Sequence, residues 1–576
     1  MLKKINKICV SPGIYWVDVP YADIRILCGC PADSVKHLIH TGLIVSEEHQ
    51  GVTFETGPNA ILLSDTMLQQ GNFANMAEFP VLQMLYNQGM LLPNHPNNTG
   101  IRPMLIGAKE QIQAQMNYIY RGNYGLTSVE ELIDAGLEAE YAAEIFRMKL
   151  KFAFGKILAT EEILDACVVE NSRIEVRNGL SVKRLDFNVF EFYYLDETVT
   201  IDLNLKPHEQ YVSTYSLGYH HIQRQYFSVI HSGEGDGWDV HRPSMSSIIM
   251  FHGKIYLIDA GPNLPETLTS LGISINEVEG VFHTHSHDDH FAGLPTLIRT
   301  DRRLKYYATK LVRTSVTKKL CALLSMQESR FTDYFEVHDL EFDCWNCVDG
   351  LEVKPILSPH PVETNIYIFR SLWEDGYRSY GHFADVSSFK VLQSMLSTDD
   401  ANVGISQGFY DQVKKDYLTT VDLKKIDIGG GLIHGDAYDF KHDQSKKIVL
   451  SHTSKALTDQ QKEIGSDGSF GSVDQLIPTY QDYGMRRAFD FMSNDFRGAP
   501  DHQLRILLNN ETFYFNPGTI IIKSGIVHDH LYLVLSGSVE MIDSKNHSRI
   551  RLYAGSLLGE LSALQSCPAS HRSEEH

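Results

Sequence analysis

The stretch HTHSHDDH, at residues 283–290, places four histidines and two aspartates within eight positions. Residues separated by one position on an extended loop point to the same side, so His285 and His287 can hold one divalent ion. Asp289 and His290 can then reach a second ion. Without metal, so many adjacent imidazoles and carboxylates would be poorly paired. The spacing H-x-H-x-D-H therefore predicts a metal site.

The residues on either side predict which elements position this array. The apolar run EVEGVF, ending at Phe282, is typical of a buried strand, and FAGLPTLI, after His290, predicts the start of a helix. Upstream, SIIMFHGKIYLIDAGPN predicts two strands joined by a His-Gly hairpin turn. The array is therefore expected on a loop that leads from a strand to a helix.

A family resemblance rests on these residues. Together with IYLIDAGPN, the phrase LGISINEVEGVFHTHSHDDHFAGLPTL resembles the metallo-β-lactamase superfamily, most closely its ribonuclease Z and phosphodiesterase branch. The resemblance covers roughly residues 220–460. It implies an αβ/βα sandwich with metal ions at one edge of two packed sheets. It also implies further ligands in a fixed order along the chain.

The chain offers a candidate at each of these places. His360 in LSPHPVET would complete the first ion's ligands, His452 in LSHTSK the second ion's, and Asp385 in HFADVSS would bridge both. Asp259, at the end of IYLID, would orient a ligand histidine. His382 competes with Asp385 as a ligand, since this chain has Ala-Asp-Val where the family commonly has Gly-Asp-Thr. The expected first site is His285, His287 and His360, and the expected second site is Asp289, His290 and His452, with Asp385 shared.

Two such ions can support hydrolysis. Ions about 3.5–4 Å apart lower the pKa of a shared water toward neutrality, which gives a bridging hydroxide for attack on phosphorus or a carbonyl carbon. The segment GGGLIHGDAYDF supplies His434 and Asp436 where ribonuclease Z-like proteins place a similar His-Glu-Ala-Thr segment. Asp289 and His434 are the catalytic candidates, with His434 as general acid; a purely structural glycine-rich turn is the alternative for this segment.

These residues lead to one favoured function and two alternatives. Histidine at position 287, where related diiron reductases tend to carry a carboxylate, favours hydrolysis over redox chemistry. The leading hypothesis is a binuclear phosphodiesterase that acts on a small phosphodiester or cyclic nucleotide. Zinc is the expected metal, and manganese and iron remain open because imidazole and carboxylate accept all three. The alternatives are a ribonuclease Z-like endoribonuclease and a non-catalytic or redox metal-binding signalling protein.

The end of the chain has a different pattern. PGTIIIKSGIVHDHLYLVLSGSVEMI, followed by GSLLGELSAL, resembles the cyclic-nucleotide-binding β-roll, with Gly559 and Glu560 opening its phosphate-binding cassette. The family places an arginine directly after the cassette proline, whereas Ala569 follows Pro568 here and Arg572 falls three residues late. An incomplete β-roll is therefore expected, which either binds a cyclic nucleotide through Glu560 or serves as a structural or protein-contact module.

Composition sets the remaining expectations. Lysine plus arginine total 51 against 72 aspartate plus glutamate, a net charge of −21, which weighs against broad nucleic-acid binding. We find no apolar run near the roughly 18 residues of a membrane helix and no secretory signal, so a cytoplasmic protein, not bound to membranes, is expected. The cysteines are expected as reduced thiols, and a homo-oligomer is expected. A four-thiolate zinc site is the alternative for Cys28, Cys30, Cys344 and Cys347.

The chain, at 576 residues, is too long for one core, and an α+β protein with several domains is expected. Residues 1–170 predict a mixed, mainly helical accessory domain, in which Ser128 and Glu131 form a capping box. Residues 205–475 predict the metal-binding sandwich. Residues 495–576 predict the β-roll.

Overall fold

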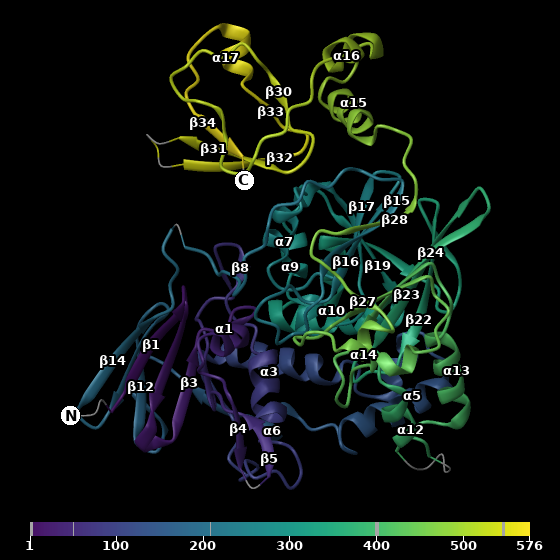
Figure 1. Cartoon of the computed structure of the whole chain (residues 1–576). Coiled ribbons are helices and arrows are strands. Elements are labelled where there is room, and N and C mark those ends of the chain that lie inside the picture. Colours follow the sequence, from purple (N-terminus) through teal and green to yellow (C-terminus); the bar gives the residue numbers. More distant parts are fainter. Residues whose placement is uncertain are drawn as a thin grey trace.

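The computed structural model describes residues 4–49, 51–207, 209–397, 403–543, 546 and 548–575. Three regions follow one another along the chain: an N-terminal region (residues 4–204), a two-sheet domain (residues 227–477) and a C-terminal module (residues 483–575). The two-sheet domain lies between the other two regions, with the C-terminal module above it (Figure 1). None of the described helices is long and apolar enough to cross a membrane.

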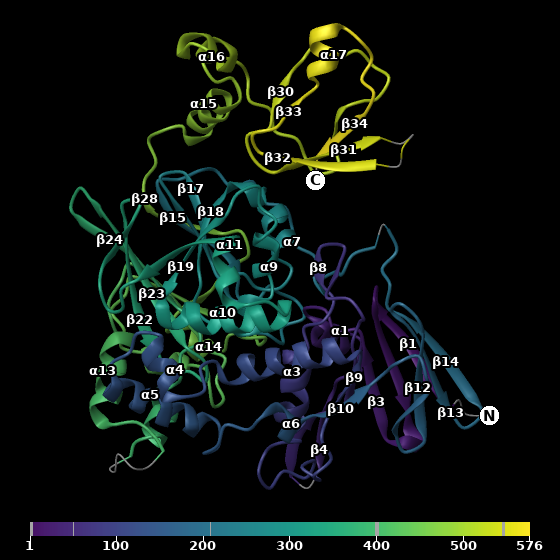
Figure 2. The same cartoon turned by 180° about the vertical axis from the view of Figure 1, so that it is seen from behind.

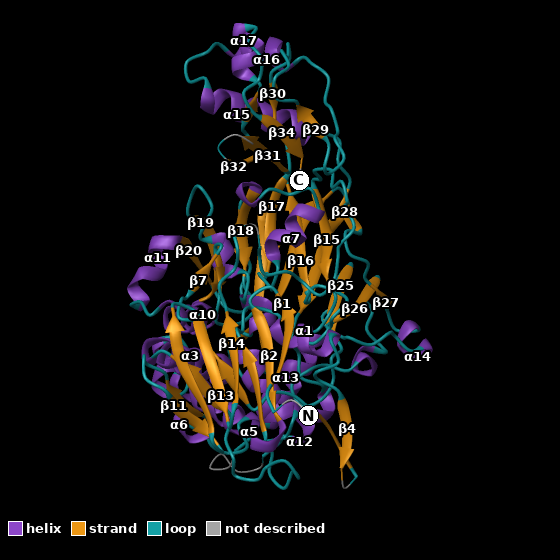
Figure 3. Cartoon of the chain, turned by 90° about the vertical axis from the view of Figure 1, so that its left-hand side faces the viewer, coloured by secondary structure: helices purple, strands orange, loops and turns teal. Residues whose placement is uncertain are grey.

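The larger sheets of the N-terminal region have six and four strands (Figure 3) and share one apolar core. The first has the order β1 (Asn6–Ser11), β2 (Ile14–Val19), β3 (Ile24–Cys28), β6 (Ala60–Leu62), β9 (Met104–Gly107) and β10 (Asp165–Val168). The second has the order β11 (Ile174–Arg177), β12 (Leu180–Asp186), β13 (Val189–Tyr194) and β14 (Glu197–Asp202). The buried side chains continue to Leu203, so this core extends beyond residue 170.

Helices of the N-terminal region pack against the two-sheet domain. Helix α3 (Lys109–Tyr124) runs along α10 (Lys310–Leu324) of that domain (Figure 2). Helix α4 (Val129–Asp134) begins at the predicted cap, because the Ser128 hydroxyl accepts the backbone N–H of Glu131 at 3.2 Å. The other α-helices in the described part of this region are α1 (Ser34–His40), α2 (Glu78–Leu82), α5 (Ala139–Phe152) and α6 (Thr160–Ile163).

Two seven-stranded sheets form the middle domain, and each is antiparallel in one half and parallel in the other. The first has the order β20 (Phe335–Leu340), β19 (Leu304–Thr309), β18 (Val278–Phe282), β17 (Lys254–Ile258), β16 (Ser246–Phe251), β15 (Phe227–Gly233) and β28 (Val473–Ile477). The second has the order β21 (Asn346–Val348), β22 (Leu351–Ser358), β23 (Thr364–Trp373), β24 (Gly376–Phe383), β25 (Leu423–Asp427), β26 (Lys447–Ser451) and β27 (Ser466–Asp467).

The predicted hairpin turn is confirmed between β16 and β17. His252 and Gly253 occupy its two corner positions with φ of 50° and 74°. Two consecutive positive φ values are typical of the tight turns whose twist matches that of the strands. The turn aligns the two strands so that β17 leads directly to Asp259.

Aromatic side chains join the two sheets face to face. The ring of Phe282 stacks on Tyr307 at 4.8 Å within the first sheet and meets Phe369 of the second sheet edge-on at 5.0 Å. The same core includes Tyr256 and Tyr367. Because this layer is buried and closely packed, the two sheets hold their loops in fixed relative positions.

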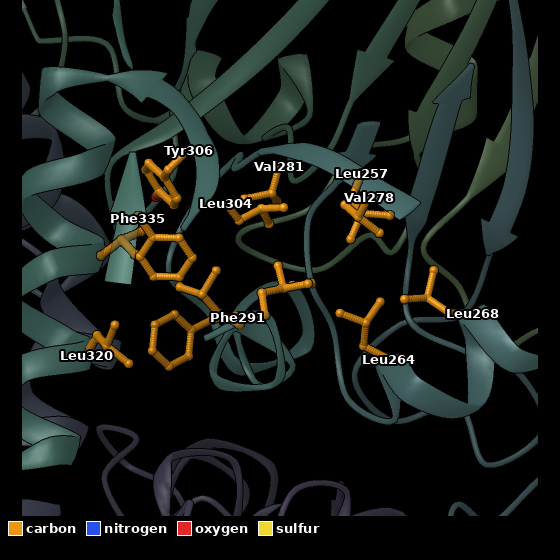
Figure 4. Close-up of a cluster of buried hydrophobic side chains, with 14 of the residues drawn as sticks. Leu257, Leu264, Leu268, Val278, Val281, Phe291, Leu304, Tyr306, Leu320 and Phe335 are labelled. Atoms are coloured by element: carbon orange, nitrogen blue, oxygen red, sulfur yellow. The ribbon is translucent and has the colours of Figure 1, made fainter. Parts of the chain in front are cut away.

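Helices cover the outer faces of both sheets, which is the expected αβ/βα layering. On the first sheet, Leu257 and Val278 face Leu264 and Leu268 of α7 (Leu264–Ser270), as Figure 4 shows. The second sheet is covered by α12 (Phe389–Ser394) and α13 (Gln407–Tyr417), together with α4 and α5 of the N-terminal region. The N-terminal region thus supplies part of the sandwich's outer layer.

The C-terminal module is smaller and has a sparse core of Ile522, Val534, Val539 and Leu558. Its helices are α15 (Tyr483–Asp495), α16 (Asp501–Leu508) and α17 (Glu560–Gln565). A four-stranded sheet has the order β29 (Ile520–Ile522), β34 (Arg572–Glu575), β31 (Ser538–Asp543) and β32 (Ser548–Tyr553), beside a pair formed by β30 (Tyr532–Leu533) and β33 (Leu557–Leu558). The β-roll assignment of this module stays a prediction.

Candidate metal centre

The predicted array spans the loop after β18, which carries His285 and His287, and the short helix α8 (Asp288–Phe291), which carries Asp289 and His290. Its side chains are buried. His285 and His290 are fully inaccessible, and His287 and Asp289 are 8% and 5% exposed. The same stretch contains His283, which faces away from this cluster, since its Nδ1 atom lies 3.0 Å from the hydroxyl of Tyr306. His283 is therefore a core histidine beside Tyr306, although its spacing from His285 and His287 is that of the ligand pair.

Three histidines form the first group of ligand atoms around one oxygen of Asp385. Nε2 of His285 lies 3.3 Å and Nε2 of His360 lies 3.5 Å from Oδ2 of Asp385. Nε2 of His360 also lies 3.0 Å from Nδ1 of His287. These four residues come from three separate loops and are close enough to share one ion.

A second group surrounds the other oxygen of Asp385. Nε2 of His290 lies 3.1 Å and Nε2 of His452 lies 3.5 Å from Oδ1 of Asp385. Oδ2 of Asp289 lies 3.1 Å from Nε2 of His452 and 3.5 Å from Nε2 of His290. The structure therefore brings all seven predicted ligands together, with one oxygen of Asp385 facing each group.

The spacing of these atoms fits divalent ions. Tetrahedral ligands about 2.0–2.1 Å from zinc lie about 3.3–3.4 Å from one another, and both groups have separations between 3.0 and 3.5 Å. The Nε2 atoms of His285 and His290 and both oxygens of Asp385 are buried without a hydrogen-bond partner. Leaving such groups unpaired is costly, and cations between them would satisfy all four atoms.

The electrostatics differ between the two groups. Burial lowers the pKa of His285, and it holds the pKa values of His287 and His360 well below the usual range, so these imidazoles are in the neutral form that binds metal. Burial also opposes protonation of His290 and His452. The facing carboxylates outweigh it and raise both pKa values, that of His452 to about 10. A cation at the second group would replace those protons.

Asp259 lies behind the second group, as the resemblance implied. Oδ2 of Asp259 is 2.8 Å from Nδ1 of His290. Its Oδ1 accepts the backbone N–H of Thr284 and its Oδ2 accepts the hydroxyl of Thr284, each at 2.7 Å. Burial raises the pKa of Asp259, but the facing His290 more than compensates, and the net pKa is lowered. The carboxylate therefore keeps the proton of His290 on Nδ1 and leaves Nε2 free for an ion.

His382 does not join the site, although it lies three residues before Asp385. Its Nδ1 is 2.8 Å from the hydroxyl of Tyr380, which in turn contacts Ser247 at 2.8 Å. Burial lowers the pKa of His382 to about 3, so it is a neutral histidine between the sheets. The competition between His382 and Asp385 is thus resolved in favour of Asp385.

Asp427 is a site residue that the sequence interpretation missed. It ends β25, where its Oδ2 lies 3.1 Å from Nδ1 of His434 and its Oδ1 lies 3.4 Å from Nδ1 of His452. Asp427, His434, His452 and Asp385 form another group that could hold an ion. An aspartate at the end of a strand, LKKID, was the available signal, since Asp259 also lies directly after a strand. Asp436, in contrast, caps the turn after His434 by accepting the N–H of Tyr438 at 3.0 Å.

The other predicted groups lie elsewhere. Glu560 is exposed at the start of α17, and its nucleotide-binding role stays a prediction. Cys28 and Cys30 are buried in the N-terminal region, whereas Cys344 and Cys347 are exposed in the two-sheet domain. Within the described part of the chain, none of the groups that could hold an ion includes a cysteine. The four-thiolate alternative is therefore wrong, and the cysteines are free thiols.

Two half-parallel sheets packed face to face, helices outside them, and a histidine–aspartate cluster at the strand ends define the class of the middle domain: the metallo-β-lactamase fold. Residues 227–465 match the family model described as anti-Pycsar protein Apyc1. The fold protein YhfI of Bacillus subtilis is a solved structure of this class; it is 14% identical, covers 43% of this chain and 98% of its own, and gives a TM-score of 0.32.

Two curated relatives also match. A "cAMP/cGMP-dependent 3′,5′-cAMP/cGMP phosphodiesterase B" of Dictyostelium discoideum is 23% identical over 353 residues, which is 58% of this chain and 31% of the relative. A ribonuclease Z of Nanoarchaeum equitans (strain Kin4-M) is 29% identical over 84 residues, 14% of this chain and 27% of the relative. The chain thus spans about a third of the length of the relatives it matches. The predicted resemblance to the metallo-β-lactamase superfamily is confirmed.

Proposed function

We propose that this protein is a binuclear metal-dependent phosphodiesterase whose substrates are small phosphodiesters, with 3′,5′-cyclic nucleotides favoured. One observation carries the proposal: Oδ2 of Asp385 faces His285 and His360, while Oδ1 faces His290 and His452. A carboxylate that presents one oxygen to each of two ligand groups suits a pair of ions a few ångströms apart. Zinc fits these imidazoles and carboxylates, as do manganese and iron.

The bound ions would supply a nucleophile from water at neutral pH and positive charge for the phosphoryl oxygens. The protein's own residues hold the ligands and handle the leaving group. The side chain of His434 is 21% exposed, whereas those of His452 and Asp385 beside it are 2% and 1% exposed. His434 is therefore the side chain of this edge that a substrate can reach.

His434 is suited to donate a proton to the departing oxygen. Its Nδ1 faces Asp427 at 3.1 Å, which leaves Nε2 as the atom that can donate. Burial lowers the pKa of His434, but Asp427 more than offsets this and the net pKa is raised above 6.5. The raised pKa favours the protonated imidazole that a general acid requires.

Substrate choice rests on the relatives and on charge. The Dictyostelium relative is described as a cyclic-nucleotide phosphodiesterase and aligns over 353 residues, against 84 for the ribonuclease Z. The net charge of −21 disfavours a long RNA substrate, because RNA binding needs a basic surface. A ribonuclease activity is the second candidate. A cyclic nucleotide at the C-terminal module, a homo-oligomeric state and a cytoplasmic location stay predictions.

A substrate and metal screen tests the proposal. The full-length protein, loaded separately with Zn²⁺, Mn²⁺ or Fe²⁺, should bind two ions per chain and hydrolyse cAMP, cGMP or bis(p-nitrophenyl) phosphate faster than a precursor tRNA. Asp385→Asn should lose at least one ion and reduce kcat/KM by about 100-fold or more. The matched control is His382→Gln, because this histidine lies in the same segment but contacts Tyr380. Two bound ions without hydrolysis of any phosphodiester would favour the signalling alternative.

A further inference from the structure

A buried ion cluster lies directly behind the ligand array. Lys319 of α10 donates to the backbone oxygen of Ser286, which stands between the first two histidine ligands, and pairs with Asp288 at 2.9 Å. Glu78 of α2 pairs with the same ammonium group, and Tyr118 of α3 donates to Asp288. Lys319, Glu78 and Tyr118 are fully buried, and Asp288 is 4% exposed. Of the N-terminal region, Tyr118 thus contacts the segment that carries four of the ligands directly, and Glu78 contacts it through Lys319.

The His360 loop has a similar attachment. Glu363, three residues after His360, pairs with Lys149 of α5, and the two side chains are 1% and 3% exposed. The second oxygen of Glu363 accepts the backbone N–H of Leu126 at 3.0 Å. Lys149 and Leu126 belong to the N-terminal region and lie more than two hundred positions before Glu363.

Two glycines make room for these carboxylates. A Cβ atom at Gly122, inside α3, would overlap the carboxylate of Glu78. A Cβ atom at Gly125, which ends α3 with a φ of 58°, would overlap the carboxylate of Glu363. Both carboxylates therefore pack directly on the backbone at the end of one helix. The ion pairs Glu78–Lys319 and Lys149–Glu363 thus both contact the C-terminal end of α3.

We propose that the N-terminal region positions the metal ligands, with Glu78 and Lys149 as positioning residues for the array loop and the His360 loop. A buried charge that loses its partner is strongly destabilised, so each loop is fixed to the N-terminal region. Ligands held in place bind metal more tightly, because less order must be imposed on binding. This inference rests on the metal centre of the proposed function and assigns a role to a region that contributes no ligand.

Cobalt binding to the full-length protein tests the inference. Co²⁺ is a suitable probe, because its visible absorption reports ligand geometry independently of catalysis. Glu78→Gln and Lys149→Met should each weaken Co²⁺ binding about tenfold and change the absorption spectrum. Gly122→Ala should do the same by displacing Glu78, although alanine by itself favours a helix. Glu78→Asp and Lys149→Arg keep the charges and should recover part of the Co²⁺ affinity. They also serve as the test variants if Glu78→Gln or Lys149→Met does not fold.

The matched control is Asp443→Asn. Asp443 pairs with Lys424, both side chains are fully buried, and Lys424 donates to the backbone oxygen of Tyr417 at 2.9 Å rather than to a ligand loop. This variant should bind Co²⁺ as the wild type does, although its unfolding midpoint falls. Wild-type affinity and spectrum in Glu78→Gln, Lys149→Met and Gly122→Ala would overturn the inference while leaving the metal centre intact. A wild-type protein that bound no Co²⁺ would overturn the proposed function as well.

Discussion

Among single residues, Asp427 connects several parts of the candidate site. Its Oδ2 accepts the backbone N–H of Val386 at 3.0 Å and of Gly435 at 3.2 Å, which fixes the loops on both sides of the ligands. The same carboxylate faces His434 at 3.1 Å and raises its pKa against the effect of burial. A group that sets both the position and the charge of the proton donor should affect the pH dependence of the reaction.

Asp427→Asn should therefore shift the alkaline limb of the activity profile to lower pH. A general acid works only while protonated, and activity is lost as pH rises through its pKa. Removing the carboxylate lowers the pKa of His434, so the loss begins at lower pH. The measurement is kcat for hydrolysis of a small phosphodiester from about pH 5 to about pH 10.

Asp436→Asn is the control for this prediction. Asp436 lies two residues from His434 but caps a turn. The Asp436→Asn substitution should therefore leave the alkaline limb of the activity profile at the same pH. His434→Gln should abolish the limb and lower kcat by about 100-fold or more. An alkaline limb that stays unchanged in Asp427→Asn would exclude His434 as the donor.

At the scale of elements, three site residues follow strand ends in the left-handed backbone region. Asp259 after β17, Asp385 after β24 and His452 after β26 have φ of 68°, 45° and 58°. Aspartate and histidine adopt this conformation more readily than most residues with side chains. The sharp change of direction lets each strand end carry its side chain to the shared edge. The backbone strain is thus associated with the placement of the ligands.

Comparing two single substitutions of Asp385, by glycine and by alanine, separates the effect of backbone strain from the effect of metal binding. Asp385→Gly and Asp385→Ala should both lose the shared ligand. Without metal, the free energy of unfolding of Asp385→Gly should exceed that of Asp385→Ala by about 1 kcal/mol, because only glycine has no Cβ penalty at positive φ. The free energy of unfolding in urea, measured with a chelator present, tests this. Ala384→Gly, at a neighbouring position without positive φ, should instead destabilise by about 0.5–1 kcal/mol. Equal stability of the two Asp385 variants would contradict the strain argument.

At the scale of the whole molecule, one buried pair ties the two sheets together behind the second ligand group. Lys425 of β25 lies 2.7 Å from Oε1 of Glu234, which follows β15, and donates to the backbone oxygens of Gly233 and Ser246, both at 2.7 Å. The backbone oxygen of Glu234 accepts the N–H of His452 at 2.8 Å. The pair therefore links the relative position of the sheets to His452, a predicted metal ligand.

Glu234→Gln should destabilise the fold by about 3–5 kcal/mol at neutral pH, because it leaves Lys425 buried without its counter-charge. Burial raises the pKa of Glu234, but the nearby ammonium group of Lys425 has the larger, opposite effect. The net pKa is lowered to about 2. A carboxyl with a lowered folded pKa stabilises above its unfolded pKa of about 4.5 and loses this effect as pH falls toward 2. The stability difference between wild type and Glu234→Gln should therefore shrink between pH 4.5 and pH 2 in urea unfolding.

Glu352→Gln provides the comparison, since Glu352 pairs with Arg370 at 2.9 Å with both side chains a quarter or more exposed. Its effect should stay within about 1 kcal/mol. A Glu234→Gln variant as stable as the wild type at neutral pH would show that the pair does not hold the sheets together.

Local sequence determined the array, its strand-to-helix loop and the hairpin at His252, because each depends on residues a few positions apart. The array and the hairpin follow from alternation and turn chemistry, which act over short distances. His360, Asp385 and His452 were predicted from the order of ligands that the family resemblance implies, and the structure brings all three to the array.

Only the tertiary structure decided which of these side chains meet. Strand pairing in the second sheet places His382 opposite Tyr367, between the sheets, whereas Asp385 reaches the ligands. The contacts of Glu78 with Lys319 and of Lys149 with Glu363 join residues more than two hundred positions apart. No local pattern specifies such pairs, because they depend on how separately folded layers pack. The candidate ligand residues could therefore be predicted from the sequence, but tertiary packing determined which residues hold them in place.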